Sequence, residues 1–130
     1  MILGIGNDLV DIRRIEKLLE QFGERFEQRI FTSAELALAN ARKDAKVATL
    51  AKRFAAKEAC LKALGEGLSG IRWTDMEVTR ESSGRPVMRL SGQALKALEK
   101  LTPTGKSVRV DLSLSDEYPY AQAFVVISAA

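Results

Sequence analysis

The stretch that most limits how this chain can fold is LAKRFAAKEACLKALGEG, which begins at Leu50 and has the spacing of a long amphipathic helix. At about 100° per residue, one side of this helix gathers Leu50, Phe54, Leu61 and Leu64. Glu58 projects only about 40° from Phe54. A carboxylate beside an apolar stripe is costly to bury without a partner. The sequence therefore raises the question of what Glu58 binds.

Two interpretations of Glu58 are open at this point. Lys62 lies four residues further on, and an acid on the N-terminal side is the favourable order for an ion pair on an exposed helix face. Alternatively, the carboxylate binds a group that comes from another element. Lys57 also lies near the stripe, but we expect its long stem to carry the ammonium out to water.

Helical patterns fill the first half of the chain. Residues 2–10 read as a strand, after which Asp11 can cap a helix that ends at Gly23. A short segment, RFEQRIF, leads to Thr32 and Glu35, which have capping-box spacing ahead of the helix AELALANARK. Glu35 is therefore interpreted as part of this cap in preference to a catalytic group. Asp44 can cap the long helix that runs to Gly65.

After the stretch GEGLSG the apolar period changes to two, which predicts strands. The segments MEVTR, PVMRLS, SVRVDLSLS and YAQAFVVIS fit this pattern, and ESSGR joins the first two as a hairpin. Ser91 is a candidate cap for a helix through GQALKALEKL. The order strand, three helices, two strands, helix, two strands predicts an α+β fold with a mainly antiparallel sheet. At 130 residues we expect a single domain, 1–130.

Composition narrows the chemistry. The chain has no histidine, which excludes Ser-His and Cys-His catalysis and nearly all zinc sites. Any metal must then be a hard, oxygen-liganded ion such as magnesium. The net charge of +3, with few aromatic residues, favours an acidic protein or a phosphorylated small molecule over nucleic acid. The single cysteine, Cys60, is expected to be a small, partly buried filler in preference to a nucleophile. The absence of a signal peptide or membrane span predicts a cytoplasmic protein.

Asp8 is a second carboxylate of interest. In an extended chain, Gly4, Gly6, Asp8 and Val10 share one face. The two glycines either leave room for a ligand or relieve crowding against a neighbouring element, in which case Asp8 only caps the turn into the next helix.

Asp8 and Glu58 together suggest a metal site. Two carboxylates from separate elements could share one magnesium ion with phosphate oxygens and water. Arg53 and Lys62, on either side of Glu58 along the helix, would supply positive charge for further phosphate oxygens. This constellation indicates phosphoryl-type chemistry on a diphosphate or a similar ligand.

Two segments resemble a known family. GIGNDLVDIRRIE and AKRFAAKEACLKALGEG are similar to the two signature motifs of the bacterial holo-acyl-carrier-protein synthases, the small 4′-phosphopantetheinyl transferases. RIFTSAEL and GRPVMRLSGQA also resemble this family in order and spacing, so the likeness covers nearly the whole chain. Two departures are visible: Asp111 and Asp116 stand where many relatives have histidines, and Asn7 replaces a frequent threonine.

The resemblance implies a fold, a reaction and a set of roles. It implies the 4′-phosphopantetheinyl transferase fold and a magnesium-dependent transfer of 4′-phosphopantetheine from coenzyme A to a serine of apo acyl carrier protein. The second product is adenosine 3′,5′-bisphosphate, and the pathway served is fatty-acid synthesis. It also implies a homotrimer with coenzyme A between neighbouring subunits.

The roles carried over by position are as follows: Asp8 and Glu58 as magnesium ligands; Lys62 beside the phosphates; and Arg53, Gly84, Arg85 and Pro86 as coenzyme A contacts. With no histidine present, Glu58 or a water held by the metal would take the serine proton. Since acyl carrier proteins are acidic, Arg13, Arg14 and Arg25 offer a docking face, unless they serve solubility alone.

Two other functions remain open from the sequence. One is modification of a carrier protein from another pathway, such as polyketide or polyunsaturated lipid synthesis. The other is a non-catalytic module that docks an acidic partner through its basic first helix. The presence of Asp8, Glu58 and Lys62 together argues against a docking module, since docking alone needs none of them.

Overall fold

Two antiparallel sheets form the strand framework of the computed structural model, which describes residues 1–65 and 69–130. The last glycine of the predicted motif, Gly67, lies outside the described residues. The larger sheet has the strand order β1-β5-β4, with bounds Ile2–Asp11, Tyr120–Ala129 and Val108–Glu117 respectively. The smaller sheet is the hairpin of β2 (Met76–Arg80) and β3 (Pro86–Leu90). The predicted α+β class and antiparallel pairing are confirmed.

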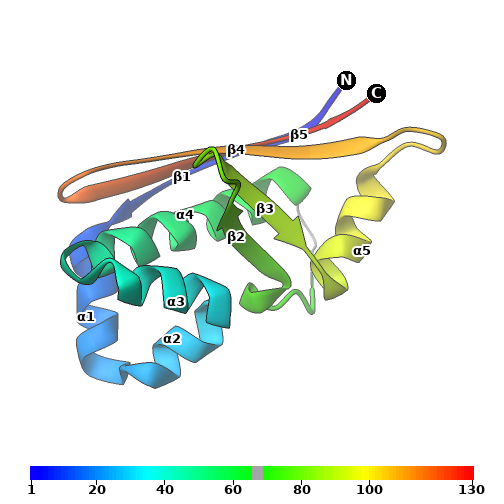
Figure 1. Ribbon diagram of the computed structural model, residues 1–130. Coiled ribbons are helices and arrows are strands. Elements are labelled where there is room, and N and C mark those ends of the chain that lie inside the picture. Colours follow the sequence, from blue (N-terminus) through cyan, green and yellow to red (C-terminus); the bar gives the residue numbers. More distant parts are fainter. Residues whose placement is uncertain (66–68) are drawn as a thin grey trace.

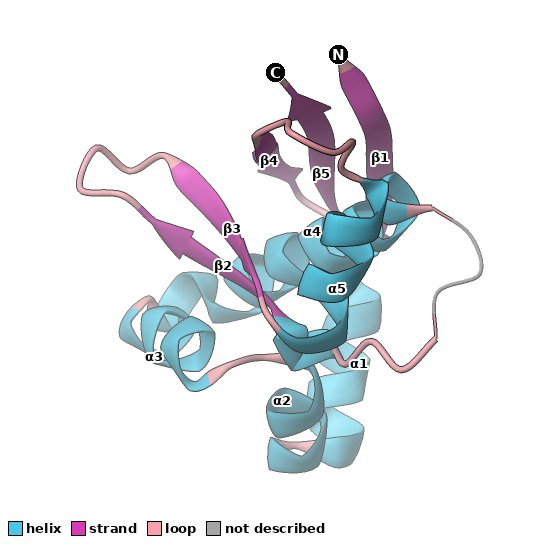
Figure 2. Ribbon diagram, turned by 90° about the vertical axis from the view of Figure 1, so that its right-hand side faces the viewer, coloured by secondary structure: helices cyan, strands magenta, loops and turns pink. Residues whose placement is uncertain are grey.

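Helix α4 (Lys46–Leu64) lies along the inner face of the larger sheet, with the other helices and the hairpin grouped around it (Figure 1). The remaining helices are α1 (Ile12–Phe22), α2 (Glu24–Ile30), α3 (Ser33–Ala41) and α5 (Gly92–Leu101), with short 3₁₀ turns η1 (Lys43–Ala45) and η2 (Trp73–Asp75). Turned by 90°, the view separates the strands of the hairpin from those of the larger sheet (Figure 2), although Arg85 beside the hairpin turn reaches Asp111 of β4. In residues 1–65 and 69–130, no helix combines the length and apolar character that a bilayer crossing requires.

The glycines of β1 allow the strand and α4 to touch. Gly4, Gly6, Asp8 and Val10 do share the face turned to α4, as the alternation predicts. A Cβ on Gly4 would overlap the carbonyl of Ala63, and one on Gly6 would overlap the carbonyl of Ala59. The idea that these glycines leave room for a ligand is therefore wrong, because the helix backbone fills that space.

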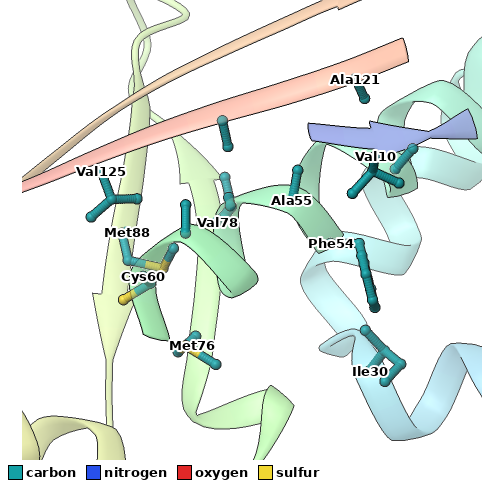
Figure 3. Close-up of a cluster of buried hydrophobic side chains, with 14 of the residues drawn as sticks. Val10, Ile30, Phe54, Ala55, Cys60, Met76, Val78, Met88, Ala121 and Val125 are labelled. Carbon is teal, nitrogen blue, oxygen red and sulfur yellow. The ribbon is translucent and has the colours of Figure 1, made fainter. Parts of the chain in front are cut away.

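Most of α4 is buried, since it packs against both sheets and the helices of the first half of the chain. Figure 3 shows the centre of this core, where Phe54 of α4 points toward Ile30 of α2 and Ala55 of α4 points toward the larger sheet. Cys60 is fully buried there, and burial raises the pKa of its thiol to about 12. This confirms its expected role as a filler.

Several local expectations change in the structure. The segment RFEQRIF forms helix α2, so four helices and not three separate β1 from β2. Asp44 lies inside η1 and does not cap α4, whose N-cap position is Ala45. Ser91 occupies the N-cap position of α5 without a side-chain hydrogen bond. The Asp11 cap and the Thr32–Glu35 capping box are both present.

Lys57 differs most from its expected position. Its ammonium does not reach water but forms a fully buried ion pair with Glu35 of α3, with 2.7 Å between Nζ and Oε1. The same ammonium donates to the carbonyl oxygens of Ile30 at 2.6 Å and Trp73 at 3.2 Å. All three protons of the ammonium therefore have acceptors, which makes its burial tolerable.

Candidate functional site

Asp8, Glu58 and Lys62 come together where β1 meets α4. Lys62 Nζ donates to Asp8 Oδ1 at 3.2 Å and to the backbone carbonyl of Asn7 at 2.9 Å. Asp8 has only 15% of its side-chain area exposed, whereas Lys62 is 55% exposed. Lys62 thus pairs with Asp8 of the strand, and the local Glu58–Lys62 ion pair considered from the sequence is not formed.

Glu58 is half-buried, and the groups around it shift the pKa of its carboxyl in opposite directions. Burial raises the pKa of this carboxyl, and the nearby Asp8 carboxylate raises it further. Arg14 and Lys62 lie close enough to act in the opposite direction. A further positive charge placed beside both carboxylates would relieve their repulsion.

The donor set at this point fits a magnesium ion. Asp8 and Glu58 supply carboxylate oxygens, and Mg²⁺ is commonly held by one or two carboxylates with the rest of its shell taken from phosphates and water. Within the part of the chain that the structure describes, no group of three or more Asp, Glu, Cys or His side chains is gathered for a metal.

Arg53 does not join these residues. Its guanidinium is fully buried among α4, α3 and the hairpin side of the core, and Nη1 donates to the Thr49 carbonyl at 3.3 Å. Nε and Nη2 have no hydrogen-bond partner among residues 1–65 and 69–130. Burial, together with the nearby positive charge of Arg80, lowers the pKa of Arg53 to about 10. Contact with a ligand requires that the guanidinium be uncovered first.

The turn that contains Gly84, Arg85 and Pro86 lies at the other edge of the larger sheet. Gly84 has a φ of 91°, which suits a glycine, and its carbonyl accepts a hydrogen bond from Arg80. Arg85 donates to Asp111 of β4 at 2.8 Å. Since β5 separates β1 from β4, a single chain does not bring this turn to Asp8 and Glu58.

The three arginines of the predicted docking face have different surroundings. Arg13 forms a 2.7 Å ion pair with Asp11 on the helix cap. Arg14 lies 5.5 Å above the ring of Phe54, a cation–π distance. Arg25 lines a hollow of about 420 Å³ between α1, α2 and η2.

This hollow was not anticipated from the sequence. Its apolar lining includes Leu18, Phe22, Phe26 and Trp73, with Arg25 and Arg29 beside them. The residues come from three elements, so no local spacing indicated them. Of the two aspartates that stand where many relatives have histidines, Asp111 binds Arg85 and Asp116 pairs with Lys52 at 2.9 Å. Both aspartates thus have partners within the chain.

The sequence is similar to a known family over nearly its whole length. Residues 4–123 match the model of the 4′-phosphopantetheinyl transferase superfamily. The holo-[acyl-carrier-protein] synthase of Nitrobacter hamburgensis is 58% identical over 99% of this chain and 96% of the relative. That of Phenylobacterium zucineum is 54% identical over 99% of this chain and 94% of the relative.

Solved structures agree with these relatives. The crystal structure of holo-[acyl-carrier-protein] synthase from Neisseria meningitidis superposes with a TM-score of 0.84 at 40% identity, covering 98% of this chain and 99% of that one. The Helicobacter pylori enzyme in complex with coenzyme A gives 0.79 at 30% identity, covering 95% and 99%.

Proposed function

Because the chain belongs to the 4′-phosphopantetheinyl transferase superfamily, we propose that it moves 4′-phosphopantetheine from coenzyme A to a serine of apo acyl carrier protein. Its full-length likeness to holo-[acyl-carrier-protein] synthases identifies it as an enzyme of this kind. The magnesium dependence, the cytoplasmic location and the role in fatty-acid synthesis are parts of the proposal.

The observation that carries the proposal is the convergence of Asp8, Glu58 and Lys62 from a strand and a helix. Two carboxylates and one ammonium suit the binding of a magnesium pyrophosphate, because the carboxylates hold the metal and the ammonium faces phosphate oxygens. Lys62 is already the more exposed member of the group, so it can turn from Asp8 to an arriving phosphate.

The proposed reaction is a displacement at the phosphorus that carries pantetheine. The serine oxygen forms a bond to this phosphorus, and the bond to the bridging pyrophosphate oxygen breaks to release adenosine 3′,5′-bisphosphate. When bound, magnesium supplies charge neutralisation for the pyrophosphate oxygens. Lys62 stabilises the negative charge on the leaving group. Glu58 or an adjacent water accepts the serine proton, since no histidine is available.

Coenzyme A binding is proposed to use the Gly84–Pro86 turn, with Arg85 facing a phosphate. Arg85 is 54% exposed, so its guanidinium can exchange Asp111 for a phosphate. Arg53 is a less direct candidate. Two of its nitrogen atoms have no hydrogen-bond partner in the described ranges, and these atoms and the neighbouring Arg80 favour an anion, but burial prevents contact until the guanidinium is uncovered.

The opposite placement of the two half-sites favours assembly as a homotrimer. In a ring, the β1 edge of one subunit can face the β4 edge of the next, which brings Asp8 and Glu58 to a neighbour's Arg85. The outer face of the larger sheet exposes Ile5, Leu9 and Phe124, each with 48% or more of its area open. Such an apolar face fits burial against another copy.

The direct test is to incubate the protein with coenzyme A, magnesium and a purified apo acyl carrier protein, and to record the carrier's intact mass. The proposal expects one added phosphopantetheine group on the carrier serine, and none when that serine is replaced by alanine. Carrier proteins of polyketide and fatty-acid pathways are compared in parallel to assign the pathway. The absence of a mass increase with every carrier tested would contradict the transferase assignment.

A further inference from the structure

The buried ion pair of Glu35 and Lys57 lies directly behind the hollow that contains Arg25. Two of the residues that line this hollow, Ile30 and Trp73, are the ones whose carbonyl oxygens accept hydrogen bonds from Lys57 Nζ. Ile30 is the last residue of α2, and Trp73 is the first residue of η2. One ammonium group therefore links two walls of the hollow that are 43 positions apart in sequence.

Glu35 holds this ammonium in place. Its Oε1 accepts from Lys57 Nζ and from the Thr32 amide, and its Oε2 accepts from the Val78 amide at 2.9 Å. Both partners of the ion pair have fully buried side chains. Each carboxylate oxygen is therefore engaged, and the ammonium has little freedom to leave the two carbonyl groups.

We propose that Lys57, fixed by Glu35, is a positioning residue that holds Ile30 and Trp73 at the spacing needed for the hollow to accept an apolar side chain of the acyl carrier protein. This inference rests on the proposed function, because it takes the carrier as the occupant. Arg25 and Arg29 line the same hollow, and their charge complements an acidic carrier surface. Lys57 touches neither substrate, so it is not a catalytic residue.

Binding of the carrier protein and the transfer step depend on opposite sides of α4. Asp8, Glu58 and Lys62 lie where α4 meets β1, whereas the Lys57 ammonium lies on the α2 and η2 side of the same helix. Loss of the ammonium should therefore raise KM for the carrier protein and leave both kcat and KM for coenzyme A near their original values. A general loosening of the fold would instead lower kcat and affect both substrates.

The test variant is Glu35→Gln combined with Lys57→Met, which removes both charges and so leaves no unpaired buried ion. We expect KM for apo acyl carrier protein to rise about tenfold or more, the size of effect seen when one anchoring contact of an interface is lost. Direct titration of carrier protein in the absence of coenzyme A should show the same weakening. Thermal unfolding verifies that the variant is folded at the assay temperature.

Two control variants distinguish a change in the distance between Ile30 and Trp73 from a general loss of stability. Glu35→Gln alone keeps a side-chain oxygen that can accept from Lys57 Nζ and leaves the Lys57 bonds to Ile30 and Trp73 available, so its KM for the carrier should rise much less than that of the double variant. Leu98→Ala, on the buried face of α5, lowers stability away from the hollow and should not change this KM. If the double variant fails to fold, Glu35→Gln with Lys57→Gln is measured instead, since the shorter amide cannot reach both carbonyl groups.

The outcomes are separable. An unchanged carrier KM in the folded double variant, or an equal rise in both controls, overturns the inference and leaves the transferase assignment intact. If the unaltered protein transfers nothing to any carrier, the proposed function itself fails, whatever the variants do.

Discussion

Glu58 is the residue on which the proposed chemistry depends most closely. It is half-buried, its neighbour Asp8 repels it, and Lys62 is engaged by Asp8. The charged form of Glu58 is stabilised when a cation lies between it and Asp8, and a bound magnesium ion would provide that cation.

Replacing Glu58 by glutamine should abolish metal-dependent transfer while leaving the fold intact, because the amide keeps the size of the side chain and loses its charge. Transfer is measured by the intact mass of the carrier, and folding by circular dichroism. Glu99→Gln on α5 makes the same change at an exposed position and should retain full activity. Full activity in the Glu58 variant would remove this residue from the metal site.

Asp11 offers a test of charge at the start of α1. Its carboxylate accepts from the Arg13 side chain and backbone, and chiefly the side-chain bond lowers its pKa from 3.8 to about 2. A lowered pKa means that the contribution of the charged cap is present above about pH 4 and is lost as the pH falls toward about 2. A carboxyl-detected NMR titration should give a midpoint near 2, and Arg13→Gln should raise it. Lys17→Gln, a more distant charge, should move it far less; equal shifts in both variants would contradict the Arg13 cause.

At the scale of elements, the contact between β1 and α4 carries both the fold and the site. Gly4 and Gly6 let the strand approach the helix backbone, and Asp8 follows on the same face. The distance between these two elements therefore decides how far Asp8 stands from Glu58.

Gly6→Ala should destabilise the protein by about 1–3 kcal/mol or more, because the new methyl group meets the rigid Ala59 carbonyl. Urea unfolding gives the free energy of unfolding, and the catalytic assay should show a loss of activity at temperatures where the variant is still folded. Ser113→Ala on the exposed side of β4 is the matched control and should change stability little. A Gly6 variant as stable as the unaltered protein would mean that strand and helix are not held this closely.

Glu35 of α3 binds Lys57 of α4 and the Val78 amide of β2, so its removal should weaken the packing of all three elements. Glu35→Ala leaves the Lys57 ammonium buried without its counter-charge, which typically costs about 3–5 kcal/mol in the free energy of unfolding. Thr32→Ala removes only the other half of the capping box and should cost about 1 kcal/mol. Chemical denaturation of both variants provides the comparison, and similar losses would show that the ion pair adds nothing beyond the cap.

The elements that were predicted from the sequence are those with a clear period. β2 and α5 have the predicted bounds, because alternation and helical spacing are strong there. Helix α2 was missed because seven residues make fewer than two turns, too few to establish a period. The burial of Lys57 was missed because its partner, Glu35, lies 22 residues away and only the tertiary fold brings them together.

The same division applies to the site. Asp8 and Glu58 were predicted as partners because each is an acid on an otherwise apolar or glycine-rich face. The placement of Arg85 at the opposite edge of the sheet could not be predicted, since it depends on the strand order β1-β5-β4. The apolar hollow could not be predicted from the sequence either, because its walls come from α1, α2 and η2.

For the whole molecule, the exposed face of the larger sheet is the feature that predicts assembly. Phe124 lies on β5, the central strand, and 48% of its area is open in the single chain. An arginine at this position would be buried without a partner in a trimer, so Phe124→Arg should give monomers. Sedimentation velocity measures the mass of the particles, and circular dichroism shows whether the monomer is folded.

Leu95→Arg on α5, an exposed leucine outside this face, is the control and should leave the assembly unchanged. Trimers that persist in the Phe124 variant, or an unaltered protein that is monomeric, would contradict the proposed interface.

The separation of Asp8 and Glu58 from Arg85, on opposite edges of one sheet, has a genetic consequence. If each active site takes one edge from each of two neighbours, Glu58→Gln and Arg85→Ala damage different halves of the same site. Co-expression of the two inactive chains then yields mixed rings in which one junction joins an intact β1 edge to an intact β4 edge. Two null alleles would complement each other within a single oligomer, although neither chain has any activity by itself.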